Sequence, residues 1–150
     1  MLIIVDADSC PVVIKEILYR AAERVRITLV LVANQPVRVP DSMYISCVEV
    51  PIGPDMADDR IVEMVEADDL VISEDLPLAD RVIAKGGFVI SSRGELYTAE
   101  NVKDHLATRD LKDVLRNSGI DTGGPSSLSQ RDRQLFANQL DRFLAKHANT

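Results

Sequence analysis

The sequence predicts an α/β fold, in which a central, mostly parallel sheet carries helices on both faces. Two observations favour this class. Over residues 2–92, short runs of β-branched and other apolar residues alternate with stretches that have helical spacing. The apolar runs are nearly uninterrupted, which is typical of parallel strands buried on both faces. Because 150 residues suit one core, we expect a single domain over residues 1–150.

The first third of the chain is expected to form three strands and one helix. Residues 2–5 (LIIV) are the first buried strand. Residues 11–25 have apolar positions at helical spacing and begin with a proline, which suits a first helical turn. The apolar run at 27–34 predicts the second strand, and the shorter, more alternating run at 43–50 predicts the third.

The next segment continues the alternation. After the turn sequence PIGP, residues 55–67 have a helical pattern, and residues 69–73 form an apolar run that ends in acidic residues. Residues 76–87 form a second helical pattern, which ends in a Gly-Gly pair typical of a helix stop. The run FVISS at 88–92 predicts another strand.

The C-terminal part is expected to be helical. One helix is predicted around residues 99–117, followed by a Gly/Ser/Pro-rich flexible loop at 118–128 and a C-terminal helix at 129–146. Ser129 and Asp132 resemble a capping pair at the start of that helix. Its apolar face suits either packing on the sheet or a homodimer, and it comprises Leu135, Phe136, Leu140, Phe143 and Leu144.

Composition excludes several classes of protein. No apolar run approaches the roughly 20 residues of a membrane span, and no basic region precedes a signal-like stretch, so we expect a cytoplasmic protein with no membrane partner. The two cysteines, Cys10 and Cys47, lack metal-site spacing, and a disulfide is not expected in a reducing compartment. Burial as a small side chain is favoured over a catalytic role for Cys10.

The net charge of −7 is unevenly distributed. Residues 1–92 contain 16 acidic and 8 basic side chains, whereas residues 93–150 contain 8 and 9. A uniformly acidic chain would argue against nucleic-acid binding, since phosphates attract lysine and arginine. An acidic cluster in one part of the chain suits divalent cations instead.

Carboxylates stand at three points that this topology brings together. Asp6 and Asp8 follow the first strand, and Asp75 follows the strand at 69–73. Asp55 and Asp58 open a helix and share one of its faces. Crowded carboxylates repel one another, and hard cations such as Mg²⁺ or Mn²⁺ relieve that repulsion. We therefore predict a Mg²⁺ or Mn²⁺ site at the carboxyl edge of the sheet.

Each acid also has a purely structural interpretation. Asp55 and Asp58 suit the positive end of a helix dipole, and Asp75 suits the N-cap of the helix that begins at residue 76. Other acids are interpreted as solvated surface charges: Asp59, Asp68, Asp69 and Asp80.

Four segments resemble a known family: VDADSCPV, PDMADDRI, ISEDLPLADRVIAKGGFVI and SRGELY. In this order they are similar to segments of the YaiI/YqxD family, bacterial proteins of unestablished activity. That family is grouped with PIN-like domains, many of which are metal-dependent ribonucleases. The resemblance implies a PIN-like three-layer sandwich with an acidic metal site.

The resemblance also implies roles for individual acids. Asp6, Asp58 and Asp75 match the catalytic, metal-binding acids of PIN domains, whereas Asp8 and Asp55 belong to the narrower family's pattern and supplement the metal site. Many PIN nucleases have a further acid where this chain has Pro77. The expected function is hydrolysis of RNA phosphodiester bonds by cation-activated water.

Three polar residues are candidates for substrate binding. Arg93 is expected either to contact a phosphate or to form a structural ion pair with an acid. Ser73 and Asn34 follow strands and either orient water and substrate or act as caps. A further set of basic residues forms either a rim for a nucleic-acid backbone or solvated helix faces: Lys85, Arg109, Lys112, Arg116, Arg131 and Arg133.

Two alternatives remain open. Asp6 and Asp8 also match the Asp-x-Asp motif of haloacid-dehalogenase-type phosphatases, in which the first acid is a nucleophile and the second a general acid. Ser73 and Lys85 follow in a suitable order, but no acidic pair comes after Lys85. A PIN-like protein that binds RNA or a protein without turnover is the other alternative, supported by Pro77 and the acidic balance.

Overall fold

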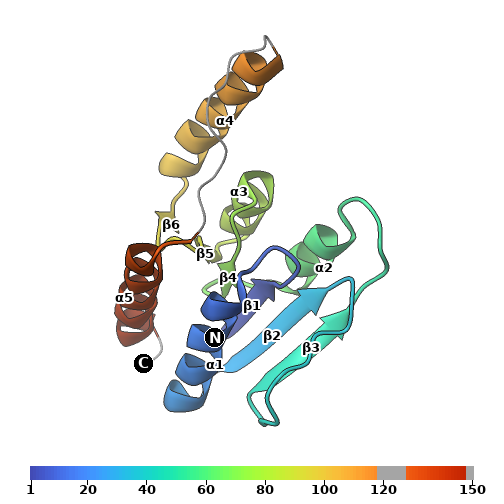
Figure 1. Ribbon diagram of the computed structural model, residues 1–150, viewed down its shortest axis with the longest axis vertical. Coiled ribbons are helices and arrows are strands. Elements are labelled where there is room, and N and C mark those ends of the chain that lie inside the picture. Colours follow the sequence, from blue (N-terminus) through green and yellow to red (C-terminus); the bar gives the residue numbers. More distant parts are fainter. Residues whose placement is uncertain (118–127, 148–150) are drawn as a thin grey trace.

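The computed structural model describes residues 1–117 and 128–147 of the chain (Figure 1). The predicted loop at 118–128 lies outside the described residues except for Leu128. The strands are β1 (Leu2–Asp6), β2 (Thr28–Ala33), β3 (Ile45–Glu49), β4 (Leu70–Ile72), β5 (Phe88–Ile90) and β6 (Leu96–Tyr97). The helices are α1 (Val12–Val25), α2 (Met56–Met64), α3 (Leu76–Ala84), α4 (Asn101–Asn117) and α5 (Gln130–His147).

The strands form one sheet in the order β3-β2-β1-β4-β5-β6. The first five are mutually parallel, and β6 is antiparallel to β5. Strand β1 is central, because Ile3 is in register with Leu29 of β2 on one side and Leu70 of β4 on the other. The predicted α/β class with a mostly parallel sheet is confirmed.

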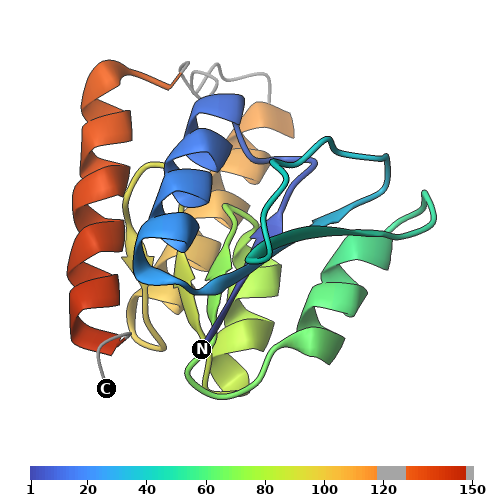
Figure 2. The same ribbon diagram turned by 90° about the horizontal axis from the view of Figure 1, so that it is seen from below.

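Helices cover both faces of the sheet and produce two separate apolar cores. Successive residues of a strand point to opposite faces, so Ile3 packs toward α1 and α5, whereas Ile4 packs toward α2 and α3. Figure 2 shows α1 and α5 together on one side of the sheet and α2 and α3 on the other. The molecule is therefore a three-layer sandwich. None of its described helices is long and apolar enough to cross a membrane.

The C-terminal helix forms as its sequence predicts. The backbone N–H of Asp132 donates to Ser129 Oγ, and the N–H of Ser129 donates to Asp132 Oδ2, each at 3.0 Å, which is a complete capping box. Most of the predicted apolar face is buried against the sheet and α1: Phe136, Leu140, Phe143 and Leu144. Leu135 is the exception, with 42% of its surface exposed. Packing on the chain's own sheet thus uses this face.

A short hairpin of β5 and β6 precedes α4, and only the first of these two strands was predicted from the sequence. Gly94 turns the chain with a positive φ of 84°, and its N–H donates to the Ser91 carbonyl at 3.0 Å. A Cβ atom at Gly94 would lie 2.5 Å from the Leu135 carbonyl carbon of α5. Glycine is therefore needed both for the turn and for the close approach of α5. From β6 the chain enters α4, which extends away from the sheet in Figure 1.

Helix α2 ends three residues earlier than predicted, and the segment behind it has a structural acid. Val65 is extended and Asp68 has a φ of 71°. Asp69 is buried, and its carboxylate accepts hydrogen bonds from the N–H groups of Leu2 and Glu66, both at 2.9 Å. The prediction that Asp69 is a solvated charge is therefore wrong, because it holds the start of β1.

Candidate functional site

The carboxyl ends of β1 and β4 meet at the middle of one sheet edge. From β1 the chain builds outward through β2 and β3, and it then returns to place β4 on the other side of β1. Ligands of open α/β sheets bind outside the carboxyl ends of the strands at such a reversal. Asp6 ends β1, and Ser73 and Asp75 follow β4, so all three lie at this point.

Asp6 is a buried carboxylate with one oxygen fully engaged. It is 8% exposed, and its Oδ2 accepts hydrogen bonds from Ser9 Oγ at 3.0 Å and Ser73 Oγ at 3.2 Å. No described group donates a hydrogen bond to its Oδ1. Burial raises the pKa of Asp6, the two hydroxyl groups lower it, and the neighbouring charges of Asp75 and Asp8 raise it again.

Asp58 faces the two strand ends from the first turn of α2. Burial, followed by the charges of Asp75 and Asp6, raises the pKa of Asp58 to about 6. The charge of Asp75 has the larger effect of the two, so the Asp58 and Asp75 carboxyl groups lie close together. Two ionised carboxylates in contact repel strongly, so this pair needs a shared proton or a bound cation between its oxygens.

Asp75 has a structural role as well. Its Oδ1 accepts a hydrogen bond from the Leu78 N–H at 3.0 Å, and its own N–H donates to Ser73 Oγ at 3.0 Å. It is therefore the N-cap of α3, as one interpretation of the sequence predicted. The cap fixes the Asp75 side chain beside Asp58.

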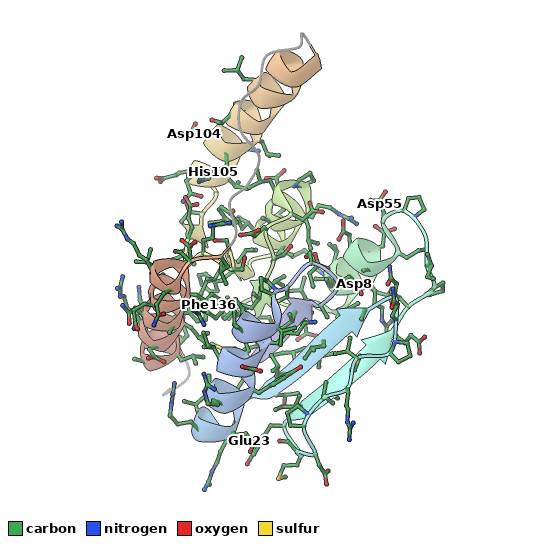
Figure 3. The ribbon with its side chains drawn as sticks, viewed as in Figure 1. Asp8, Glu23, Asp55, Asp104, His105 and Phe136 are labelled. Carbon is green, nitrogen blue, oxygen red and sulfur yellow. The ribbon has the colours of Figure 1, made fainter. Side chains whose placement is uncertain are left out.

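Asp8 and Asp55 lie at the margin of this group. Asp8 is exposed, and its Oδ2 accepts a hydrogen bond from the Asn34 N–H at 2.8 Å, which ties the loop after β1 to the end of β2. Asp55 is the N-cap residue of α2 in a left-handed conformation, and its charge contributes to the raised pKa of Asp58. Figure 3 shows Asp55 on the loop that enters α2 and Asp8 near the ends of the neighbouring strands.

The donor set of this group suits a hard, partly hydrated cation. It consists of carboxylate oxygens with serine hydroxyls, which Mg²⁺ and Mn²⁺ prefer over softer ligands. Among residues 1–117 and 128–147, no three Asp, Glu, His or Cys side chains form a ready-made metal cage. Mg²⁺ commonly binds through one or two carboxylates and keeps several water ligands. Asp6 Oδ1, which accepts no hydrogen bond from the described residues, and the neighbouring Asp58 and Asp75 carboxyl groups suit a cation bound in this partly hydrated way.

The three predicted substrate-binding residues have different surroundings. Ser73 is buried at the centre of the site, between Asp6 and Asp75. Asn34 contacts the site through its backbone N–H, which donates to Asp8 Oδ2. Arg93 lies to one side, where its Nη1 donates to Asp132 Oδ2 at 2.6 Å and its Nε lies 3.8 Å from Glu74 Oε1. The structural ion pair, one of its two predicted roles, is thus present.

Glu74 was not predicted as a site residue, although it lies between Ser73 and Asp75, which were. Glu74 Oε1 accepts a hydrogen bond from Ser92 Oγ at 2.7 Å. Both side chains line a cavity of about 10 Å³ that also borders Asp6 and Ser73. A polar cavity of this size holds about one water molecule. The only available signal was the acidic pair at the strand end, because spacing does not reveal where a side chain after a strand points.

Cys10 also borders this cavity, and its environment disfavours an activated thiol. Burial raises the pKa of Cys10 to about 12; the charge of Lys15 opposes this rise, and those of Asp6 and Glu74 add to it. A nucleophilic cysteine needs a lowered pKa. The interpretation of Cys10 as a small packed side chain agrees with this environment.

Comparison with other proteins matches nearly the whole chain. A model of the uncharacterised YaiI/YqxD family matches residues 4–146. A UPF0178 protein of Shewanella amazonensis is 61% identical over 146 residues, covering 97% of this chain and 98% of its own. UPF0178 proteins of Colwellia psychrerythraea (57% identical; 100% and 99% covered) and Alkalilimnicola ehrlichii (61%; 96% and 97%) are also similar. No solved structure gives a significant match. The chain belongs to the YaiI/YqxD family.

Proposed function

We propose that this protein is a PIN-like, Mg²⁺- or Mn²⁺-dependent nuclease that hydrolyses phosphodiester bonds in RNA. The observation that supports the proposal best is the proximity of the Asp58 and Asp75 carboxyl groups beside buried Asp6. In the absence of a cation, Asp58 loses its proton above a pH of about 6, and its charge then repels those of Asp75 and Asp6. An acid site with such an internal repulsion is stabilised by a divalent cation.

The proposed roles follow from the hydrogen bonds of each acid. Asp6, Asp58 and Asp75 would hold the cation, and Asp8 and Asp55 would bind its water ligands. When bound, a divalent cation activates water and stabilises charge on the phosphate oxygens. Ser9 and Ser73 hold Asp6 through Oδ2, and no described residue donates a hydrogen bond to Oδ1, which would bind the cation. Below a pH of about 6, Asp58 carries a proton in the cation-free protein and would release it when the cation binds.

The phosphatase alternative has less structural support. It requires Lys85 beside Asp6, but Lys85 follows the C-terminal end of α3, and its Nζ donates to the Val62 carbonyl at 2.6 Å. Asp6 lies at the edge of the sheet where α3 begins. The nuclease needs no lysine there.

The test combines cation binding with RNA cleavage. We would titrate Mn²⁺ into wild type, Asp6→Asn and Asp41→Asn by calorimetry, and follow cleavage of a single-stranded RNA in the same buffers. Asp41→Asn is the matched control, because it removes one negative charge from an exposed loop outside the site. We expect Asp6→Asn alone to lose both activities. Wild type that binds no Mn²⁺ at millimolar concentration would refute the proposal, and binding without cleavage would favour the non-catalytic alternative.

Two further expectations stay predictions. The apolar face offered for a homodimer is largely used within the chain's own core, so a dimer would need another surface. Sedimentation of the purified protein measures that directly. The cytoplasmic location is testable by cell fractionation.

A further inference from the structure

We infer that the groove between α1 and α5 binds the phosphodiester backbone of a single-stranded RNA that leads into the acidic site. The groove has a volume of about 280 Å³. Its described lining consists of Val13, Glu16, Ile17 and Arg20 from α1 and Gln130, Arg133, Gln134 and Ala137 from α5. The two helices lie side by side in Figures 1 and 2. This inference names the substrate path of the proposed nuclease, and to that extent it rests on the proposed function.

The two arginines of the groove have no acidic partner among the described residues, so their charges are not neutralised within the chain. Elsewhere, Arg24, Arg81 and Arg93 form ion pairs with aspartates at 2.6–2.9 Å. Within the described part of the chain, neither Arg20 nor Arg133 forms an ion pair or a side-chain hydrogen bond. Two unpaired guanidinium groups facing one groove attract an anionic ligand.

The remaining groups of the groove favour a nucleic-acid strand over a simple anion. Val13, Ile17 and Ala137 provide apolar surface for ribose and base, while Gln130 and Gln134 offer amide donors and acceptors. Glu16 is the acidic member of the described lining, and it pairs with neither arginine. A strand whose bases are unpaired can use both kinds of surface.

The groove also has a suitable direction. Helix α1 follows β1, so it begins at the sheet edge where Asp6 lies. Helix α5 begins at the same edge, because Asp132 in its first turn bonds to Arg93, and Arg93 approaches Glu74 beside the acidic site. The groove therefore starts near the acids and runs away from them along the sheet face, as expected for bound nucleotides that flank a cleaved bond.

The test measures RNA binding without cleavage. We would measure the fluorescence anisotropy of a labelled oligouridylate in EDTA at several salt concentrations, with wild type and the double variant Arg20→Ala/Arg133→Ala. We expect binding at least about tenfold weaker in the variant. Loss of two phosphate contacts should reduce the slope of log K against log salt by about 1.4. The same measurement is made with an oligothymidylate of the same length. Similar affinities for the oligouridylate and the oligothymidylate would assign recognition to the shared phosphate backbone.

The control removes the same charge from other exposed places. Arg38 and Arg142 lie outside the groove, so Arg38→Ala/Arg142→Ala should leave the affinity and the salt slope close to wild type. Equal weakening by both double variants would overturn the inference, since the attraction would then be diffuse. It would also be overturned if wild type bound neither strand, or if the groove variant bound both as tightly as wild type.

A parallel Mn²⁺ titration separates this inference from the proposed function. The groove variant should bind Mn²⁺ like wild type, while Asp6→Asn should lose Mn²⁺ and keep RNA affinity in EDTA. Groove-dependent RNA binding by a wild type that binds no Mn²⁺ would support the groove and refute the nuclease. If wild type binds Mn²⁺ and cleaves RNA, but the groove variant binds RNA as tightly as wild type, the nuclease would be supported and the groove refuted.

Discussion

Replacing Asp58 by asparagine should stabilise the cation-free protein at neutral pH. The pKa of Asp58 is raised from its ordinary value of 3.8 to about 6, by burial and by the charges of Asp75 and Asp6. Between these two pH values, the folded protein keeps a proton that the unfolded chain has released. The free energy of unfolding therefore falls as the pH rises through this window, and above it the folded state bears the whole repulsion.

The magnitude follows from the same difference in pKa. The interval from 3.8 to about 6 corresponds to about 3 kcal/mol if it acts in full. Because Asp58 is only partly buried, solvent screening reduces the expected effect to about 1 kcal/mol. Asparagine has nearly the same shape and no charge, so Asp58→Asn should gain this amount at pH 7. A gain of that size raises Tm by roughly 2–4 °C in a chain of this length.

Urea unfolding in EDTA measures the effect. Wild type, Asp58→Asn and the control Asp41→Asn would be compared at neutral pH and again below pH 3.8, where Asp58 is protonated in both states of the wild type. The gain should appear only at neutral pH and only in Asp58→Asn. Added Mn²⁺ should stabilise wild type more than Asp58→Asn. The reasoning is wrong if Asp58→Asn is less stable than wild type at pH 7, or if Asp41→Asn gives the same gain.

Three further predictions concern the site and its support. Asp75→Asn should keep the α3 cap and its stability but weaken Mn²⁺ binding. Asp75→Ala should weaken Mn²⁺ binding and also lower the free energy of unfolding in urea by about 1 kcal/mol. Equal stability of the two variants would contradict the capping role. Gly94→Ala should lower the free energy of unfolding by at least about 2 kcal/mol, because alanine strains a φ of 84° and its Cβ collides with the Leu135 backbone. A decrease below about 0.5 kcal/mol would exclude that close packing. Calorimetric Mn²⁺ affinity should fall as the pH drops below about 6, since Asp58 must release a proton, and a flat profile from pH 5 to 7 would argue against its role.

The expected gain in Asp58→Asn illustrates a general property of functional sites. Acids that a cation would hold together repel one another when it is absent, so the folded state carries a local destabilisation. Here the buried hydrogen bonds of Asp6 with Ser9 and Ser73 and the α3 cap of Asp75 offset part of that cost. The arrangement is thus maintained by neutral donors that do not themselves compete for the ligand position.

The sequence by itself determined those features that depend on local pattern. The uninterrupted apolar runs identified the parallel strands, because only strands buried on both faces need apolar residues at every position. The α5 capping box and the Asp75 cap were readable because each joins residues three positions apart. The edge location of Asp6 and Asp75 was also predictable, since parallel strands end at one edge.

Only the tertiary structure decided which distant residues meet. The hydrogen bond from Leu2 to Asp69 spans 67 residues and that from Arg93 to Asp132 spans 39, so no local spacing encodes either. The proximity of Asp58 to Asp75 required α2 to pack on β1 and β2 beside α3. Strand β6 has two residues and forms by pairing with β5, which a propensity over so short a stretch does not reveal. Local order follows from the chain's own periodicity, whereas these contacts follow from packing of the two helix layers on the sheet.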